Sequence, residues 1–199
     1  IPLRLVGSET CIRDRIDRLG DGDVLVLAGS IPYTMPDDMY QRILERIQGR
    51  GVLTVVDATR DLLVKVLPYH PFLVKPNNYE LGEIFGVKLS TREEVVPYGK
   101  KLQEMGAQNV LISMAGKGAV LIAADGQSMG APAPKGTLVN GVGAGDSMVA
   151  GFLTGWMEKK DYVHAFHMGI AAGSASAFSE NLATREEVLQ VLQLSLIHI

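Results

Sequence analysis

The strongest constraint on the fold of this chain is a regular alternation. Short apolar runs rich in β-branched residues, at 24–28, 52–56 and 110–113, alternate with segments of helical periodicity. Between the first two runs, apolar residues recur three to four positions apart: Met39, Ile43, Leu44 and Ile47. A strand, a helix and a second strand in this order are typical of a βαβ crossover. The sequence therefore predicts an α/β fold with a mainly parallel sheet.

The rest of the chain falls into two parts. A weaker strand at 72–74 precedes a helix through Leu81, Ile84 and Phe85, and a further helix is expected at about 91–105. After residue 113, three short extended segments predict an antiparallel meander, with an Asp125-Gly126 turn: 118–123, 127–130 and 136–139. Helices are then predicted at about 144–157, 162–178 and 184–192. We expect one domain over 1–193 and an apolar tail at 194–199.

Charge and cysteine content exclude several classes of protein. The 199 residues carry 19 Lys and Arg against 22 Asp and Glu, which gives a net charge of −3 and no basic excess for nucleic acid. The one cysteine, Cys11, cannot form an internal disulfide, which fits a reducing cytoplasm. No apolar run approaches the roughly 20 residues that span a bilayer. We expect a cytoplasmic protein with neither nucleic acid nor membrane as partner.

The segment Asn-Gly-Val-Gly-Ala-Gly-Asp-Ser at 140–147 carries the clearest chemistry. Three glycines before an amphipathic helix leave its first amide N–H groups accessible, and the helix dipole adds positive potential, so the turn can bind an anion. Asp146 lies in the first turn of that helix. A carboxylate repels a bound phosphate, but it can accept the proton of a hydroxyl that attacks the phosphate. A tight turn with Asp146 as a helix cap is the structural alternative.

Two other nucleotide-binding motifs fit these letters poorly. A Walker A loop needs Ser or Thr after Gly-Lys, but Gly116-Lys117 is followed by Gly118. A dinucleotide fingerprint that begins at Gly141 ends on Asp146 instead of Gly or Ala. A nucleotide-dependent oxidoreductase is therefore disfavoured and kept as an alternative.

The Gly-Ala-Gly-Asp string at 143–146 resembles the phosphate-transfer motif of the PfkB (ribokinase-like) carbohydrate kinases. Lys-Pro-Asn-Asn-Tyr-Glu at 75–80 is similar to the family's Lys-Pro-Asn-x-x-Glu segment, and Ser-Met-Ala-Gly-Lys-Gly at 113–118 to a nucleotide-contact loop. The resemblance covers residues 5–190. It implies a ribokinase-like three-layer α/β/α sandwich, of which this chain holds the C-terminal two-thirds without the N-terminal part and lid.

The resemblance also implies roles for individual residues. Asp146 would be the general base, and the amides of Gly143, Ala144 and Gly145 would contact the transferring phosphoryl group. Mg²⁺ would be held by Asn77 and, through water, by Glu80. The ATP contacts implied are Lys75, Asn77, Ser113, Gly116, Gly118 and Ser174. Two positions depart from the family, Ala115 in place of the commoner Gly and Gly141 in place of Ser or Thr, and a requirement for a monovalent cation such as K⁺ stays open.

The function implied is ATP-dependent phosphorylation of a phosphorylated ketohexose. Fructose 1-phosphate is the first expected substrate, with tagatose 6-phosphate and fructose 6-phosphate as alternatives. The full-length form is expected to be a homodimer. Because the sugar-binding residues of the family lie mostly in its N-terminal part, a nucleotide-binding remnant without turnover is a further alternative.

Overall fold

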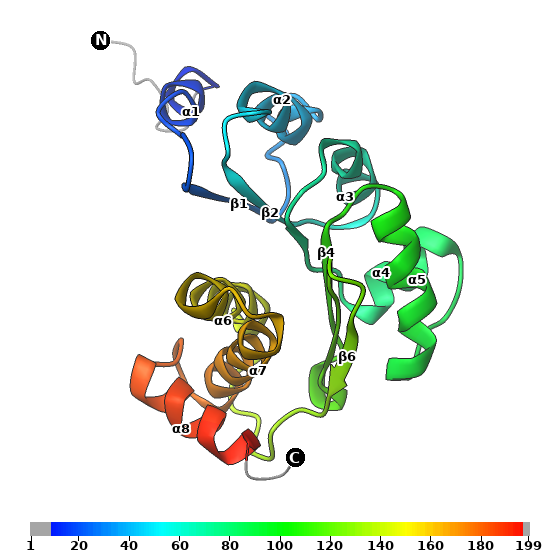
Figure 1. Cartoon of the computed structure of the whole chain (residues 1–199), viewed down its shortest axis with the longest axis vertical. Coiled ribbons are helices and arrows are strands. Elements are labelled where there is room, and N and C mark those ends of the chain that lie inside the picture. The colour runs from blue at the N-terminus through cyan, green and yellow to red at the C-terminus, as the bar shows by residue number, and fades with distance from the viewer. Residues whose placement is uncertain (1–8, 197–199) are drawn as a thin grey trace. The chain divides into compact units, whose positions relative to one another are not determined.

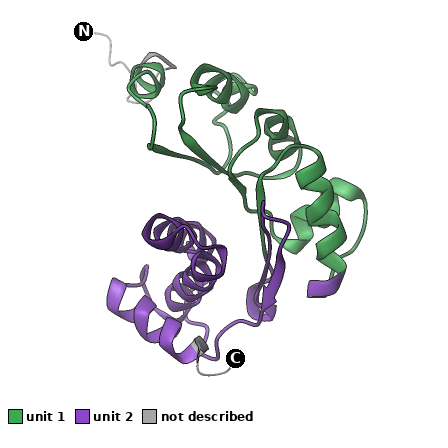
Figure 2. Ribbon diagram, in the orientation of Figure 1, with its two compact units in different colours: residues 1–90, 94–112 green, residues 91–93, 113–199 purple. Residues whose placement is uncertain are grey.

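The computed structural model describes residues 9–196, and these form two compact units (Figure 2). Unit 1 comprises the residues up to Ser90 together with Glu94–Ile112, and unit 2 comprises Thr91–Glu93 and the residues from Ser113 onward. Each unit has its own arrangement of helices and strands, so each is described by itself.

Unit 1 is built on four parallel strands in the order β1 (Val24–Ala28), β2 (Leu53–Asp57), β3 (Leu73–Val74) and β4 (Asn109–Ser113). Its helices are α1 (Glu9–Ile16), α2 (Met39–Ile47), α3 (Arg60–Val66), α4 (Asn78–Phe85) and α5 (Arg92–Glu104), with a 3₁₀ turn at Leu67–Tyr69. Figure 1 shows α1, α2, α3 and α5 on one side of these strands. The predicted βαβ crossover is confirmed.

The core of unit 1 lies around strands β2 to β4. Val55, Val56, Leu73 and Val110 are fully buried, which is why these strands read as continuous apolar runs in the sequence. Because the strands are parallel, the residues that follow β2 and β3 come out at the same edge of the sheet. That edge carries Asp57 and the 75–80 segment.

Unit 2 contains the antiparallel hairpin β5 (Ala119–Ile122) and β6 (Ser128–Ala131), then α6 (Ala144–Lys159), α7 (Tyr162–Phe178) and α8 (Arg185–Leu196). A 3₁₀ turn, η2 (Ala115–Lys117), precedes β5. The hairpin turn at Asp125-Gly126 is confirmed, with the Gly126 amide donating to the Ala123 carbonyl at 3.1 Å. The six described strands are therefore four parallel and two antiparallel.

The third strand predicted for the meander, at 136–139, is wrong. This segment has no strand structure, and its Val139 amide donates to the Ala177 carbonyl at the end of α7, at 2.9 Å. Pro132 and Pro134, just upstream, have no amide hydrogen with which to extend the ladder. The segment is bound to a helix end instead of a strand.

Helices α6 and α7 pack closely through small residues, and Figure 1 shows them side by side. A Cβ atom on Gly173 would lie 3.0 Å from the Ala144 carbonyl oxygen, and one on Gly155 would lie 2.8 Å from the Ala165 Cα. Only glycine lets the two backbones approach this closely. The last turns of α7 consequently lie against the first turn of α6.

Helix α8 extends to Leu196, further than the predicted 184–192 and into the expected tail. Residues 197–199 of that tail lie outside the described residues, so the boundary at 193 stays a prediction. Within residues 9–196, no helix combines the length and the apolar character needed to cross a bilayer.

Candidate functional site

The first turn of α6 leaves several backbone donors open. The Ala144 amide donates to the Gly141 carbonyl at 3.4 Å and the Ser147 amide to the Gly143 carbonyl at 2.8 Å. The amides of Gly143, Gly145 and Asp146 have no acceptor among the residues that the structure describes. Unpaired N–H groups at the positive end of a 16-residue helix can bind an anion.

Backbone conformation favours glycine at position 143, and the side chain of Leu182 adds a contact that a larger residue would have to displace. The φ of Gly143, +77°, is in the left-handed region, which residues with a side chain rarely adopt. A Cβ atom there would also lie 2.6 Å from the Leu182 Cδ2. Residue 143 is the N-cap of α6, so its backbone sets the direction of the open amides.

Asp146 is exposed and occupies the third helical position of α6. Over residues 9–196, its carboxylate makes neither a hydrogen bond nor an ion pair. A carboxylate without a protein partner, next to open amides, can accept a proton from a ligand hydroxyl. This geometry agrees with the predicted role of Asp146 as a base, which stays a prediction.

The glycine-rich segment is anchored to the end of α7 by contacts that the sequence did not reveal. The Asn140 side chain accepts from the Val142 amide at 3.0 Å and donates to the Glu180 carbonyl at 3.2 Å. The Asn140 amide donates to the Ala177 carbonyl at 3.2 Å. These partners are about 40 residues apart in the chain, so no local pattern signals them.

The predicted nucleotide loop, also in unit 2, forms η2 and its flanks. Ser113 ends β4, Gly116 is exposed, and Gly118 has a φ of +93° with its amide bonded to the Ala115 carbonyl at 2.9 Å. A Cβ atom on Gly118 would lie 2.6 Å from the Pro132 carbonyl carbon, so local packing already requires this glycine. Ser174 is partly exposed in α7. Their contacts with a nucleotide stay predictions.

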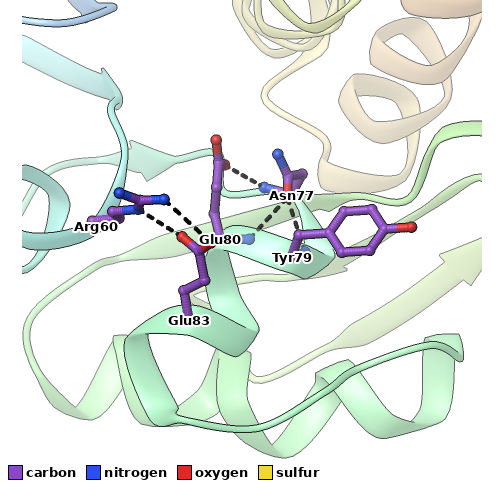
Figure 3. Close-up of polar contacts among 5 residues, drawn as sticks. All are labelled: Arg60, Asn77, Tyr79, Glu80 and Glu83. Atoms are coloured by element: carbon purple, nitrogen blue, oxygen red, sulfur yellow. Dashed lines mark hydrogen bonds and ion pairs between the residues drawn. The ribbon is translucent and has the colours of Figure 1, made fainter.

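In unit 1, Asn77 and Glu80 form a capping box at the start of α4 (Figure 3). The Asn77 Oδ1 accepts from the amides of Tyr79 and Glu80, both at 2.9 Å, and the Glu80 Oε2 accepts from the Asn77 amide at 2.8 Å. Both lone pairs of the Asn77 oxygen are therefore used within the protein. The Glu80 Oε1 has no partner among the described residues, so it is the oxygen that fits a water of a hydrated Mg²⁺.

An ion pair next to the capping box ties α4 to the start of α3. The Arg60 guanidinium donates to the two carboxylate oxygens of Glu83 at 2.8 and 3.4 Å (Figure 3), and it lowers the pKa of the Glu83 carboxyl. Arg60 has a φ of +50°, which is uncommon for a residue with a side chain. The pair lies on the same face of α4 as Glu80, one turn away.

Lys75 is buried and pairs with a residue that the sequence analysis did not assign. Its Nζ lies 3.1 Å from the Asp57 Oδ2, and the two side chains are 8% and 18% exposed. Burial, and then the charge of Asp57, raise the pKa of Tyr40, whose hydroxyl donates to the Ala28 carbonyl at 2.8 Å. The signal for Asp57 was its position directly after a buried strand. The predicted contact of Lys75 with nucleotide phosphate would compete with this ion pair.

The candidate residues thus form two groups. Lys75, Asn77 and Glu80 belong to unit 1, and Ser113, Gly116, Gly118, Ser174 and the 143–146 segment belong to unit 2. Among the described residues, no set of three or more His, Cys, Asp or Glu side chains could hold a metal ion by itself. A hydrated cation held through Glu80 is compatible with that finding.

A family model for the pfkB family carbohydrate kinases matches residues 7–188, nearly the whole chain. The chain belongs to the PfkB family. This agrees with the motifs at 75–80 and 143–146 and with the ordered strands and helices that position them.

Two PfkB relatives with curated names are close in sequence. The 1-phosphofructokinase of Bacillus subtilis is 48% identical over 179 residues, covering 90% of this chain and 59% of that enzyme. The D-tagatose-1-phosphate kinase of Bacillus licheniformis is 35% identical over 170 residues, covering 85% of this chain and 56% of that enzyme. The chain therefore spans less than two-thirds of the length of these PfkB relatives.

Solved structures give the same fold. A Staphylococcus aureus protein of 36% identity superposes with a TM-score of 0.87, over 94% of this chain and 62% of that one. The Arabidopsis thaliana ribokinase, at 22% identity, superposes with a TM-score of 0.73 over 86% of this chain and 56% of that one. The predicted ribokinase-like α/β fold is confirmed.

The two departures from the PfkB pattern have different structural consequences. Ala115 has a φ of +48°, so the commoner glycine would fit this backbone without strain. A Cβ atom on Gly141 would meet nothing within 4 Å, so the Ser or Thr of relatives would find space there. Gly141 lacks the hydroxyl that Ser or Thr would carry, whereas the departure at Ala115 involves no polar side chain.

Proposed function

We propose that this chain is the phosphoryl-transfer part of a PfkB sugar-phosphate kinase that converts fructose 1-phosphate and ATP to fructose 1,6-bisphosphate and ADP. The observation that carries the proposal is the first turn of α6, where open amides at Gly143, Gly145 and Asp146 adjoin an unpartnered carboxylate. The name of the Bacillus subtilis relative supports the choice of sugar phosphate.

In the proposed reaction, the Asp146 carboxylate takes the proton of the sugar C6 hydroxyl while that oxygen attacks the γ-phosphorus of ATP. The bond between the γ-phosphorus and the bridging oxygen breaks, and ADP leaves with that bond's electron pair. The open amides of Gly143 and Gly145 donate to the phosphoryl oxygens, as in an oxyanion hole, where one donor contributes about 3 kcal/mol. The predicted contact of the Ala144 amide requires that it first release the Gly141 carbonyl. Positioning of the reactants supplies much of the remaining rate.

We further propose that Glu80 holds Mg²⁺ through water, and that Asn77 acts by fixing the Glu80 side chain. Mg²⁺ when bound would neutralise charge on the nucleotide phosphates. The contacts of Lys75, Ser113, Gly116, Gly118 and Ser174 with ATP belong to the same proposal. Activation by K⁺, the homodimeric full-length form and the cytoplasmic location stay predictions.

A second candidate substrate is D-tagatose 1-phosphate, because a relative of 35% identity is named for it. It differs from fructose 1-phosphate at a single ring carbon, so the proposed chemistry is the same. Tagatose 6-phosphate and fructose 6-phosphate complete the set of sugars to compare. The nucleotide-dependent oxidoreductase is not favoured, since the family that matches is one of kinases.

The test measures ADP release with these four sugar phosphates, by the 199-residue chain and by the chain extended to the length of its relatives. Asp146→Asn in the extended chain is expected to lower kcat by about 10²–10⁴, the usual contribution of a general base. Turnover with none of the sugars, or an Asp146→Asn variant with full activity, would contradict the proposal. ATP binding measured by calorimetry, without turnover of any sugar, would instead favour a nucleotide-binding remnant that has no kinase activity.

A further inference from the structure

We infer that Ser176 is a positioning residue for the first turn of α6, an inference that rests on the proposed function of that turn. Ser176 lies near the end of α7 and is only 3% exposed. Its hydroxyl donates to the Ser147 Oγ at 2.8 Å and accepts from the Ala183 amide at 3.1 Å. Ser147 directly follows Asp146, so this bond reaches the segment that carries the proposed base.

Ser176 uses both sides of its hydroxyl group. An amide N–H can only donate, so the Ser176 oxygen accepts from Ala183, and the Ser176 proton is directed to the Ser147 Oγ. The Ser147 oxygen is thereby held toward α7, while its backbone N–H donates to the Gly143 carbonyl at 2.8 Å. A chain of donors thus runs from Ala183 through Ser176 to the turn that contains Asp146.

Loss of the Ser176 hydroxyl would give Ser147 a competing partner. A serine inside a helix readily bonds to the carbonyl four residues earlier, which for Ser147 is that of Gly143. This carbonyl already accepts the Ser147 amide, and Gly143 holds the left-handed backbone on which the open amides depend. The Ser176 hydroxyl therefore keeps the side chain of Ser147 away from the turn that aims Asp146.

The overall packing of α6 on α7 does not depend on this hydroxyl. Gly173 contacts the backbone of Ala144, and the amides of Val139 and Asn140 donate to the Ala177 carbonyl. These are backbone contacts, so a Ser176→Ala variant should retain the helix pair. Its effect should be confined to the orientation of the first turn.

The first experiment measures amide hydrogen exchange, which needs no turnover. In Ser176→Ala, the Ser147 amide is expected to exchange at least tenfold faster than in the parent chain, because its bond to the Gly143 carbonyl is weakened. Ser179→Ala is the matched control, since the Ser179 hydroxyl bonds to Ala175 and Glu187 and not to α6. Unchanged exchange at Ser147 in Ser176→Ala would overturn the inference.

The second experiment uses the extended, active chain. Ser176→Ala is expected to lower kcat about tenfold with the KM for ATP changed less than twofold. Ser147→Ala has no hydroxyl that could bond to the Gly143 carbonyl, so it should keep kcat within about twofold of the parent and should restore kcat in the double variant. Ser179→Ala should retain the parent kcat. A double variant as slow as Ser176→Ala would overturn the inference. If Asp146→Asn proves fully active, the proposed base fails while the exchange result still decides the role of Ser176.

Discussion

Helices α4 and α6 both have an acidic residue in the first turn, but they differ in the hydrogen bonds of that turn. Each has an acidic residue at its third helical position, Glu80 in α4 and Asp146 in α6. In α4, the N-cap Asn77 accepts two amides and Glu80 folds back onto the Asn77 amide. In α6, the N-cap is Gly143, which has no side chain, and Asp146 has no partner among the described residues.

The difference lies in what satisfies the first amides of a helix. A capping side chain stabilises the helix by about 1 kcal/mol and closes its donors to any ligand. A glycine cap forgoes that stabilisation and leaves the donors open. The start of α6, whose first amides are unpaired, is thus the better candidate for phosphoryl binding. The start of α4, whose first amides are capped, offers mainly a rigid carboxylate.

The largest loss of kcat should come from a side chain at position 143, in the turn that precedes α6. Gly143→Ala must adopt the left-handed backbone or shift it, and its Cβ would approach Leu182. Misdirected amides should lower kcat by about 10²–10³, the loss usual for an oxyanion-hole donor. Steady-state ADP release by the extended chain checks this.

Gly141→Ala is the control for that substitution, because position 141 has open space and no left-handed φ. It should change kcat less than threefold. Equal losses in the two variants would show that the backbone of Gly143 has no special part in the reaction.

The second-largest effect is expected at the buried ion pair of unit 1, between Lys75 and Asp57. Lys75→Met removes the ammonium group paired with the largely buried Asp57 carboxylate, which should lower the free energy of unfolding by about 3 kcal/mol. Lys75→Met with Asp57→Asn should recover part of that loss, because the buried negative charge is also removed. Urea denaturation checks both variants, and a double variant less stable than Lys75→Met would refute the pairing.

Much of the fold could be read from periodicity, because α2 buries Met39, Ile43 and Ile47 at helical spacing. The prediction at 136–139 failed because Val139 is bonded to Ala177, a partner 38 residues away that no local pattern encodes. The 143–146 turn was found because its glycines are adjacent in sequence. Asp57, opposite Lys75, was missed because the pairing of β2 with β3 brings the two together.

A smaller effect should separate the two functions of the α4 capping box. Asn77→Ala removes two accepted hydrogen bonds and should lower the free energy of unfolding by about 1 kcal/mol. Glu80→Gln keeps an oxygen for the Asn77 amide, so its stability should change by less than about 0.5 kcal/mol. In the extended chain, Glu80→Gln should nonetheless raise the Mg²⁺ concentration for half-maximal rate, because the charge is lost. An unchanged Mg²⁺ requirement would confine Glu80 to helix capping.

The smallest effect concerns the strained residue of the predicted nucleotide loop. A left-handed backbone costs a residue with a side chain about 1 kcal/mol or more, and glycine relieves this at the expense of greater freedom in the unfolded chain. Ala115→Gly should therefore raise the free energy of unfolding by about 0.5 kcal/mol. Ala124→Gly, at an exposed turn position without a left-handed φ, should lower it by a similar amount. Urea denaturation of both variants gives the sign of each change in the free energy of unfolding. A loss of stability in Ala115→Gly would mean that the backbone at residue 115 carries no strain.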